Sequence, residues 1–363
     1  MTRPLPPLGS LAAQCTRFLA GDGPRTTSSL LAQIPENATM DVYGDGGVVR
    51  ELEEEVARIV GKEKALFLPT GIMTQQTTLR VLTDRRGNPR VAFHSLGHLR
   101  THEENAFALL HGLEEVLANG GSDEAPVSLA SLRALPLPIG ALLLELPQRD
   151  IGGYLPTWTQ LTAQVAWARS NDVAVHLDGA RLWEAAPYYA ASAQKSIADI
   201  CALFDTVYVS FYKGLGGISG SCVAGPADII DEVSLWRTRH GGRPYMLWPY
   251  AASALSVLSR SSDMPAYYRR ARALAKKLRD VEGLDVLPQD VRSPLMHLRF
   301  SATAAQMDRR VRRIIREQGV MTLRGSTSEG TKLQRYEFQV GRASMEFSLD
   351  EMVSLFGQLA GQE

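Results

Sequence analysis

The chain has few cysteines and no long apolar run, and these two absences exclude several classes of protein. Three cysteines among 363 residues are too few for a disulfide framework or a cysteine metal cluster, and they favour a reducing compartment. They are Cys15, Cys201 and Cys222. The best apolar stretch, residues 139–146, is interrupted by Glu145 and is far shorter than the roughly 20 residues of a membrane span.

A signal peptide and an excess of charge are missing as well. The first 20 residues lack a continuous apolar segment and include Pro4, Pro6 and Pro7, so we expect a soluble, cytoplasmic protein. The 39 lysines and arginines balance the 39 aspartates and glutamates. This neutrality gives no reason to expect a nucleic acid or a membrane surface as partner. The basic segments 268–279 and 309–316 alternate with apolar residues at helical spacing, which is typical of solvated helix faces.

At about 150 residues per domain, the length predicts two domains, a large one and a smaller one. Residues 1–40 are rich in Pro, Gly, Ser and Thr, and we interpret them as an N-terminal arm with one short helix over residues 11–19. A large domain over residues 41–260 and a smaller C-terminal domain over residues 261–363 follow, and the arm could pack near the latter.

Within the large domain, short apolar runs alternate with helical patterns, which is typical of a mostly parallel, buried sheet. The expected strands are residues 65–68, 91–93, 141–146, 173–177, 206–211 and 221–224. The expected helices are residues 49–60, 71–82, 159–170, 227–239 and 246–259. The C-terminal part combines helices over residues 264–281 and 304–318 with strands over residues 295–300 and 335–340.

The most informative segment is residues 205–217, where a strand leads into Lys213 and the chain then becomes rich in glycine. A lysine at the end of a buried strand is costly to desolvate unless its charge is removed or used. Burial lowers the lysine pKa and makes the neutral amine available for a Schiff base. The following glycines, Gly214, Gly216 and Gly217, allow a bulky ligand to approach the backbone. A lysine that only reaches into solvent is an equally simple interpretation of this segment alone.

A second strand, residues 173–177, is followed by Asp178 and, three residues later, by Arg181. Ligands of parallel sheets collect outside the carboxyl ends of the strands, so we expect Asp178 and Lys213 to lie there together. A buried carboxylate needs a cationic partner. That partner is either Arg181, in a structural ion pair, or the protonated pyridine nitrogen of a ligand.

A third segment, residues 66–73, joins a strand to the start of a helix through Pro-Thr-Gly. The exposed N–H groups and the positive dipole end of a helix bind phosphate readily. Many strand–helix turns contain Thr-Gly, so this segment is informative only together with the other two.

In this order, the three segments resemble the threonine aldolase and β-eliminating lyase family of pyridoxal-phosphate (PLP) enzymes. Residues 41–44 (Asp-Val-Tyr-Gly) are similar to a family segment of the same sequence, and residues 69–73 (Pro-Thr-Gly-Ile-Met) resemble its phosphate turn. Residues 176–181 (His-Leu-Asp-Gly-Ala-Arg) and 213–216 (Lys-Gly-Leu-Gly) match the two most specific motifs. The resemblance implies an α/β fold of the PLP-dependent transferase type, fold type I, with a mostly parallel sheet between helices and a smaller C-terminal α+β domain.

The resemblance also implies a role for each matching residue. Lys213 would hold the PLP aldehyde as a Schiff base. Asp178 would keep the pyridine nitrogen protonated, which makes the ring an electron sink. The phosphate would meet the backbone N–H groups of Gly71 and Ile72, and Ser210 stands where the broader fold group often has a phosphate-binding hydroxyl.

Three further residues would contact the cofactor or the substrate. Arg181 would lie close to the phenolic oxygen of the cofactor or to the substrate. Arg342 stands where the family has a late arginine that binds the substrate carboxylate. Tyr43, in the Asp-Val-Tyr-Gly segment, is a further candidate for substrate binding.

Three histidines, His94, His98 and His102, are spaced four residues apart. On one helix they would face together, but Gly97 interrupts the helix and no aspartate or cysteine completes a ligand set, so we expect no metal. In the family, a histidine in a His-x-x-x-x-Glu pattern stacks over the PLP ring, and His98 with Glu103 reproduces this spacing. His98 would then be the catalytic base. The alternative is a histidine that is merely exposed or buried in the core.

The sequence departs from the family pattern at several positions. Ile72 replaces a threonine of the phosphate turn, and Tyr212 replaces the small residue before the lysine. Residues 217–220 read Gly-Ile-Ser-Gly where Ala-Pro-Val-Gly is typical. Residues 240–245 replace the family's Gly-Gly-Gly-Met-Arg-Gln, which leaves Arg243 as the nearest candidate for its phosphate-binding arginine. These departures leave the substrate open.

The implied function is that of a PLP-dependent carbon–carbon lyase. It would cleave a β-hydroxy-α-amino acid to glycine and an aldehyde, as an L-threonine aldolase does. β-Elimination and transfer of the glycyl carbanion to another aldehyde would use the same lysine, aspartate and ring. A PLP-binding regulatory protein is the non-enzymatic alternative, against which the retention of Lys213, Asp178 and Arg181 argues. In this fold type the site lies at a subunit interface, so the resemblance also implies a homodimer or homotetramer.

Overall fold

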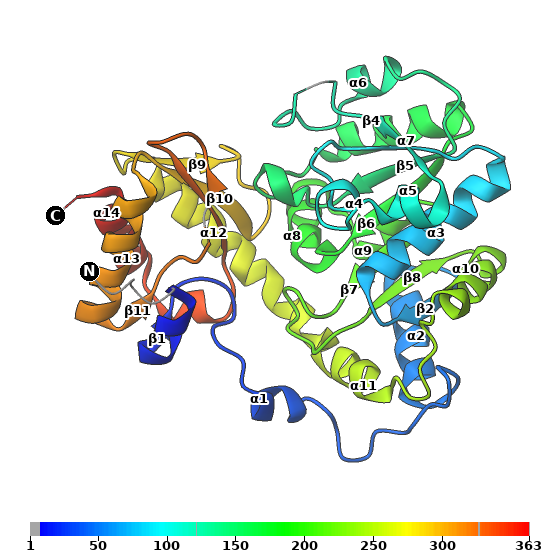
Figure 1. Cartoon of the computed structure of the whole chain (residues 1–363), viewed down its shortest axis with the longest axis horizontal. Coiled ribbons are helices and arrows are strands. Elements are labelled where there is room, and N and C mark those ends of the chain that lie inside the picture. Colours follow the sequence, from blue (N-terminus) through cyan, green and yellow to red (C-terminus); the bar gives the residue numbers. More distant parts are fainter. Residues whose placement is uncertain (1–7, 121, 326, 363) are drawn as a thin grey trace. The chain divides into compact units, whose positions relative to one another are not determined.

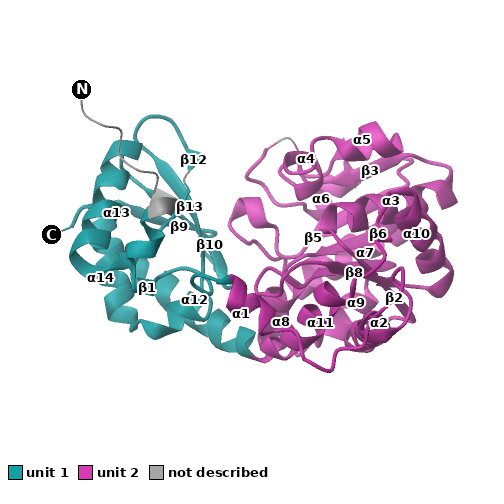
Figure 2. Ribbon diagram, turned by 60° about the horizontal axis from the view of Figure 1, so that its bottom comes forward, with its two compact units in different colours: residues 1–26, 263–363 teal, residues 27–262 magenta. Residues whose placement is uncertain are grey.

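The chain folds as two units, which Figure 2 shows in two colours. The computed structural model describes residues 8–120, 122–325 and 327–362, so Pro4, Pro6 and Pro7 lie outside the described residues. The larger unit comprises residues 27–262, and the smaller unit combines residues 1–26 with residues 263–363. The domain boundaries at residues 40 and 260 stay a prediction.

A mostly parallel sheet forms the centre of the larger unit (Figure 1). In spatial order its strands are β2 (Lys64–Leu68), β8 (Ser221–Gly225), β7 (Thr206–Ser210), β6 (Ala174–Gly179), β5 (Ala141–Glu145), β3 (Arg90–Phe93) and β4 (Glu114–Leu117). Only β8 runs antiparallel to its neighbours in this set, to β2 on one side and to β7 on the other. The sheet expected from the sequence is confirmed.

The strands of this sheet are apolar because helices shield them from water. Every residue of β6, β7 and β8 is buried, as is typical of strands covered on both faces. The helices of the larger unit are α1 (Thr27–Leu31), α2 (Gly47–Val60), α3 (Gly71–Arg86), α4 (His98–Thr101), α5 (Ala106–His111), α6 (Leu129–Arg133), α7 (Trp158–Ser170), α8 (Leu182–Ala193), α9 (Ile197–Ala202), α10 (Ala227–Arg239) and α11 (Trp248–Val257). Short 3₁₀ turns add η2 (Arg149–Ile151) and η3 (Leu258–Asp263).

Helix α3 carries the feature that matters most for the site. It packs against β5, β6, β7 and β8. Its buried residues nevertheless include a polar run, namely Thr74, Gln75, Gln76, Thr77 and Thr78. Buried polar side chains are the informative exception in a core, because each needs a hydrogen-bond partner. The buried polar run of α3 therefore points to a functional site on the sheet.

The smaller unit contains a four-stranded antiparallel sheet and three α-helices among its described residues. The strands follow the order β12 (Thr327–Ser328), β13 (Gln334–Gln339), β10 (Leu295–Phe300) and β9 (Leu284–Leu287). The helices are α12 (Met264–Leu278), α13 (Ala304–Gln318) and α14 (Leu349–Ala360), with a 3₁₀ turn η4 (Ala343–Glu346) before the last of them. The α+β character expected for the C-terminal part is present.

The helix expected over residues 11–19 is wrong. The structure has a 3₁₀ helix, η1 (Leu8–Gln14), followed by a short strand, β1 (Arg17–Phe18). This strand pairs in parallel with β11 (Val320–Met321), and the N–H of Leu19 donates to the carbonyl of Met321 at 2.9 Å. Pairing with a segment about 300 residues away overrides the local apolar pattern.

Membrane insertion of a helix finds no support in the structure. None of the described helices is both long enough and apolar enough to cross a bilayer.

Candidate active site

The site is built at the carboxyl ends of three neighbouring parallel strands. Glu145 on β5 lies opposite Asp178 on β6, and Asp178 lies opposite Tyr208 on β7. Residues in register on adjacent strands present their side chains to the same face of a sheet. Lys213 follows β7 after three residues, and its Nζ lies 5.9 Å from the ring centroid of Tyr208 and 5.6 Å from that of Tyr212. As expected, Asp178 and Lys213 lie close together, at the carboxyl ends of β6 and β7.

Asp178 is held by a chain of buried hydrogen bonds. Its Oδ1 accepts the N–H of Ala180 at 3.0 Å, and its Oδ2 accepts the side-chain amide of Gln75. The Oε1 of Gln75 lies 2.6 Å from Nε2 of His176, whose Nδ1 lies 2.8 Å from the hydroxyl of Thr206. Burial lowers the pKa of His176 to about 3, so the ring is neutral. It donates Nε2–H to Gln75, which leaves the Gln75 amide group to face Asp178.

Gln75 is therefore a site residue that the sequence analysis missed. Gln75 is 1% exposed and lies on α3, from which its side chain holds Asp178 of β6 in place. The signal that could have revealed it is the run of threonine and glutamine at the start of a helix that must be buried.

Lys213 has the electrostatic environment of a reactive amine. Burial lowers its pKa, and the positive charge of Arg181 lowers it further. The carboxyl groups of Asp178, Glu145 and Glu184 act in the opposite direction without reversing the shift. Because the net pKa is lowered, a larger fraction of this amine is neutral near neutral pH than for an ordinary lysine.

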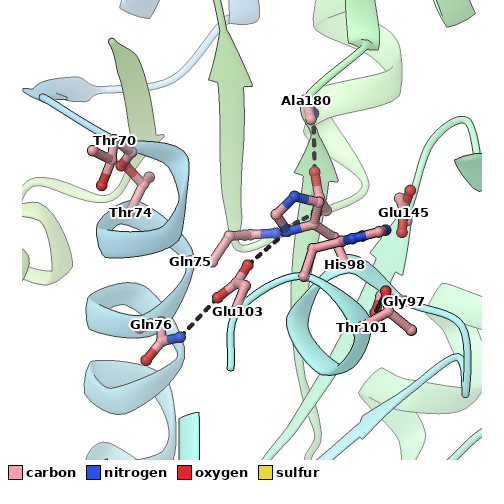
Figure 3. Close-up of polar contacts among 12 residues, drawn as sticks. Thr70, Thr74, Gln75, Gln76, Gly97, His98, Thr101, Glu103, Glu145 and Ala180 are labelled. Atoms are coloured by element: carbon pink, nitrogen blue, oxygen red, sulfur yellow. Dashed lines mark hydrogen bonds and ion pairs between the residues drawn. The ribbon is translucent and has the colours of Figure 1, made fainter. Parts of the chain in front are cut away.

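A second pair of site residues is His98 and Glu103, which lie beside α3 (Figure 3). His98 is the first residue of α4, and Gly97 before it has an extended backbone, which is where the helical pattern breaks. His98 Nδ1 lies 2.9 Å from Oε1 of Glu103, and Oε2 of Glu103 accepts the amide of Gln76 at 2.7 Å. The fully buried carboxyl of Glu103 thus fixes the imidazole through one nitrogen.

The pKa of His98 is raised above its ordinary value of 6.5. Burial acts to lower this pKa, but the hydrogen bond to Glu103 and the negative charges of Asp178 and Glu103 outweigh it. Lys213 acts weakly against them. These interactions also show that His98, Asp178 and Lys213 share one electrostatic environment.

The other two histidines of the series point elsewhere. His94 Nε2 lies 2.9 Å from the carbonyl of Ala125, and its Nδ1 accepts the N–H of Leu96 at 3.0 Å. His102 Nε2 lies 3.3 Å from Asp150. The described residues contain no group of three His, Cys, Asp or Glu side chains that could hold a metal ion.

The start of α3 follows a tight turn at Pro69 and Thr70. Thr70 caps the helix by accepting the N–H of Met73 at 3.2 Å, and the next two residues are Gly71 and Ile72. A Cβ on Gly71 would lie 2.1 Å from the hydroxyl of Tyr208, so only glycine fits there. A second hydroxyl reaches this turn, because Ser219 donates to the carbonyl of Pro69 at 3.3 Å.

Ser210 is buried and has a structural hydrogen bond. Its hydroxyl donates to the carbonyl of Ala180 at 2.7 Å, and its own carbonyl accepts the indole N–H of Trp183 at 3.0 Å. It therefore ties β7 to the turn after Asp178. Its role in phosphate binding stays a prediction.

Of the remaining candidates, Arg181 is close enough to Lys213 to lower its pKa, Tyr43 contacts Tyr245 and Arg243, and Arg342 belongs to the other unit. Arg181 is the N-cap residue of α8, three residues after Asp178. The backbone N–H of Tyr43 donates to Tyr245 at 2.8 Å, and Arg243 donates to the carbonyl of Tyr43 at 2.7 Å. Arg342 belongs to the smaller unit, where it is exposed at the start of η4. Substrate binding by Tyr43 and Arg342 stays a prediction.

The comparison with known families decides the identity. The model of the β-eliminating lyase family matches residues 25–301. The chain belongs to this family. The low-specificity L-threonine aldolase 1 of Arabidopsis thaliana is 26% identical over 299 residues, which cover 79% of this chain and 82% of the relative. The low specificity L-threonine aldolase of Escherichia coli K12 is 29% identical over 255 residues, covering 69% and 74%.

Solved structures agree with this assignment. A putative L-allo-threonine aldolase from Listeria monocytogenes superposes with a TM-score of 0.91 at 35% identity, covering 97% of this chain and 98% of that one. Fold type I, expected from the sequence motifs, is confirmed by this match, and so is the family itself. The protein is a PLP-dependent carbon–carbon lyase.

The residues of this chain fit the cofactor. Lys213 offers an amine of lowered pKa, and the buried Asp178 lies in the same electrostatic environment. Gly71 brings the backbone at the start of α3 close to the hydroxyl of Tyr208, and the free N–H groups of a helix start are suited to a phosphate.

Proposed function

We propose that this enzyme cleaves β-hydroxy-α-amino acids between Cα and Cβ, giving glycine and an aldehyde, with L-threonine-like compounds as substrates. The names of the Arabidopsis and Escherichia coli relatives and of the Listeria structure support this substrate class. The observation that carries the proposal is the meeting of Lys213, Asp178 and the His98–Glu103 pair at one end of the sheet.

The chain's own residues would hold the cofactor at four points. Lys213 would bind its aldehyde, Asp178 its ring nitrogen, and the N–H groups of Gly71 and Ile72 its phosphate. When bound, the cofactor supplies an electron sink for the pair left on Cα as the Cα–Cβ bond breaks. The hydrogen bonds from Gln75 and Ala180 orient Asp178 so that its charge is available to keep the ring nitrogen protonated.

His98 would act as the base on the substrate's β-hydroxyl group. Because Glu103 accepts the proton on Nδ1, the lone pair of a neutral His98 is on Nε2. That nitrogen would take the hydroxyl proton as the new aldehyde forms. The raised pKa makes His98 a stronger base than an ordinary histidine and a protonated, inactive one at acidic pH.

The competing reactions are not favoured by the comparisons. β-Elimination would release a 2-oxo acid and ammonia, whereas the relatives reported above are named aldolases. Transfer of a glycyl carbanion needs the same residues and a second aldehyde. A regulatory protein without turnover would have no need of an oriented Asp178 and a base beside it.

A second copy of the chain would cover an exposed apolar surface of the larger unit. Large apolar side chains are exposed on the larger unit around the start of α3 and the Tyr43 segment, namely Met40, Val42, Tyr43, Ile72 and Tyr245. Their exposed fractions lie between 41% and 63%, which is costly for a surface that meets only water. A homodimer or homotetramer would cover them, and sedimentation of the wild type and of Tyr245→Asp tests this.

The cytoplasmic location stays a prediction.

Product analysis tests the reaction. Purified holoenzyme given L-threonine should yield glycine and acetaldehyde in equal amounts, and Lys213→Ala should yield neither. Release of a 2-oxo acid and ammonia without glycine would refute the aldolase and favour the elimination.

A further inference from the structure

The carboxyl group of Glu184 lies directly beside the turn that carries Lys213. Glu184 is in the first turn of α8 and is 1% exposed. Its Oε1 accepts the N–H of Gly214 at 3.1 Å. A Cβ on Gly214 would lie 2.3 Å from that oxygen, which explains why glycine must follow the lysine. Glu184 therefore fixes the backbone immediately after Lys213.

The second oxygen of the same carboxyl group is unused. Oε2 of Glu184 is buried and has no hydrogen-bond partner among the residues that the structure describes. A buried polar atom without a partner costs on the order of 1–3 kcal/mol. Burial accordingly raises the pKa of Glu184, although the charges of Arg181 and Lys213 oppose this shift. Such an oxygen is suited to a partner that is present in only one state of the enzyme.

Three carboxyl groups stabilise the charged form of Lys213, and they differ in how many of their oxygens already accept a hydrogen bond. Asp178 already accepts one hydrogen bond on each oxygen, from Gln75 and from a backbone N–H. Glu145 does so too, with partners in the side chain of Gln148 and a backbone N–H at 3.0 Å each. Only Glu184 among the three keeps an oxygen without a partner in the described structure.

The remaining groups around the lysine do not accept its proton. Arg181 is a cation and disfavours the ammonium form of Lys213. The rings of Tyr208 and Tyr212 lie 5.9 and 5.6 Å from its Nζ, and burial raises both phenol pKa values, so both stay neutral. His98 is itself a base whose positive form repels Lys213.

We propose that Glu184 is the positioning residue that accepts the ammonium group of Lys213 while an amino acid holds the cofactor. This inference rests on the proposed function, in which the amine of the amino acid displaces the lysine. The exchange conserves protons, because the amino acid arrives as an ammonium ion and loses one proton while Lys213 leaves as an amine and gains one. Oε2 of Glu184 supplies the hydrogen-bond acceptor that the new ammonium group needs.

The size of the effect follows from the charge that is removed. An opposite charge about 4–6 Å away shifts a pKa by about 1–3 units, and we take the lower end because Asp178 and Glu145 still stabilise the released ammonium group in the variant. One unit corresponds to a factor of ten in equilibrium. Glu184→Gln keeps the oxygen that Gly214 needs but loses the charge, so it should weaken displacement of Lys213 by glycine about tenfold.

The test measures where the cofactor is bound rather than turnover. Holoenzyme is incubated with increasing glycine and then reduced with borohydride, which fixes the cofactor to the amine that holds it. Mass spectrometry of the Lys213 peptide gives the fraction still on the lysine. We expect Glu184→Gln to match the wild type without glycine and to require about ten times more glycine for half displacement.

Two variants separate this role from a purely structural one. Glu53→Gln is the matched control, because Glu53 also accepts a backbone N–H, at 2.7 Å from Phe67, and its pKa is also raised by burial, to about 7. It should leave the glycine curve unchanged. Glu184→Asp keeps the charge but moves it away from Gly214. It should need about the wild-type glycine concentration for half displacement of Lys213. This variant also tests the inference if Glu184→Gln does not fold.

The outcomes are distinguishable. A Glu184→Gln curve that coincides with the wild type, or a tenfold shift in Glu184→Asp, would overturn the inference and leave the proposed function intact. Failure of glycine to displace the cofactor in the wild type would refute the proposed function, and the inference with it.

Discussion

The pH dependence of the reaction should be set by His98 and Glu103, and the structure allows this to be tested with one atom changed. Glu103→Gln removes the negative charge that raises the pKa of His98 while keeping an oxygen to accept from Nδ1. The amide nitrogen that replaces Oε2 would face the donor end of Gln76. Oε1 of Gln76 is buried and has no hydrogen-bond partner in the described structure, so a flip of the Gln76 amide lets this oxygen accept from the new nitrogen. The Gln76 nitrogen then takes the position that lacked a partner, and the number of unpaired polar atoms is unchanged. The variant should therefore fold normally.

The direction and size of the effect follow from these contacts. His98 works as a base only when neutral, so activity is lost as the pH falls through its raised pKa. Removing the adjacent charge lowers that pKa by about 1 unit, equivalent to about 1.4 kcal/mol. The acidic limb of kcat/KM should therefore move about 1 pH unit lower in Glu103→Gln and should disappear in His98→Ala.

The assay is aldehyde release from L-threonine between acidic and neutral pH, with His102→Gln as the matched control. The ring of His102 lies 5.0 Å from that of His98 on the same helical turn but pairs with Asp150, so its loss should leave the limb in place. An unmoved acidic limb in Glu103→Gln would refute the assignment of His98 as the base.

Four further outcomes are expected at the same site. Lys213→Ala should lose borohydride-fixed cofactor and turnover while keeping the wild-type circular dichroism spectrum; a retained label would mean that another lysine carries the cofactor. Asp178→Asn should still bind PLP, measured by fluorescence titration, but its rate should fall by orders of magnitude because an amide cannot hold the ring nitrogen protonated. Gly71→Ala should weaken PLP binding, since its Cβ would collide with a tyrosine hydroxyl. Gln75→Leu should cost about 3 kcal/mol in urea denaturation, against about 1 kcal/mol for Gln164→Leu, which loses one hydrogen bond to a backbone carbonyl.

The main strands and helices could be predicted from the sequence because their burial is nearly uniform. Apolar runs such as residues 206–211 must lie in a covered sheet, and helices such as α13 (Ala304–Gln318) repeat apolar residues on one face. Segment 11–19 was misread because its partner, β11, is far away in sequence. The short elements β4, α4 and α5 were missed because they are too brief for a period to emerge, and the 12-residue helices α8 and α14 were not predicted either.

The candidate site divides in a similar way. Lys213, Asp178 and His98 could be named from the sequence, because each stands in a local motif of the family. The roles of Gln75 and Glu184 could not be assigned in this way, because they come from tertiary contacts: Gln75 reaches Asp178 from α3, and Glu184 reaches Gly214 from α8. No spacing along the chain encodes such contacts.

The buried polar run of α3, residues 74–78, connects these observations. A helix packed on the centre of a sheet would be most stable with apolar residues at its buried positions, yet this one buries the consecutive residues Gln75 and Gln76. Each amide orients one carboxyl group of the site, Gln75 that of Asp178 and Gln76 that of Glu103. One helix therefore fixes both the group that would face the ring nitrogen and the group that raises the pKa of His98. Burying two amides lowers the stability of the fold, but it holds two carboxyl groups in place at one site. This function explains why a helix with little apolar periodicity lies in the core of the enzyme.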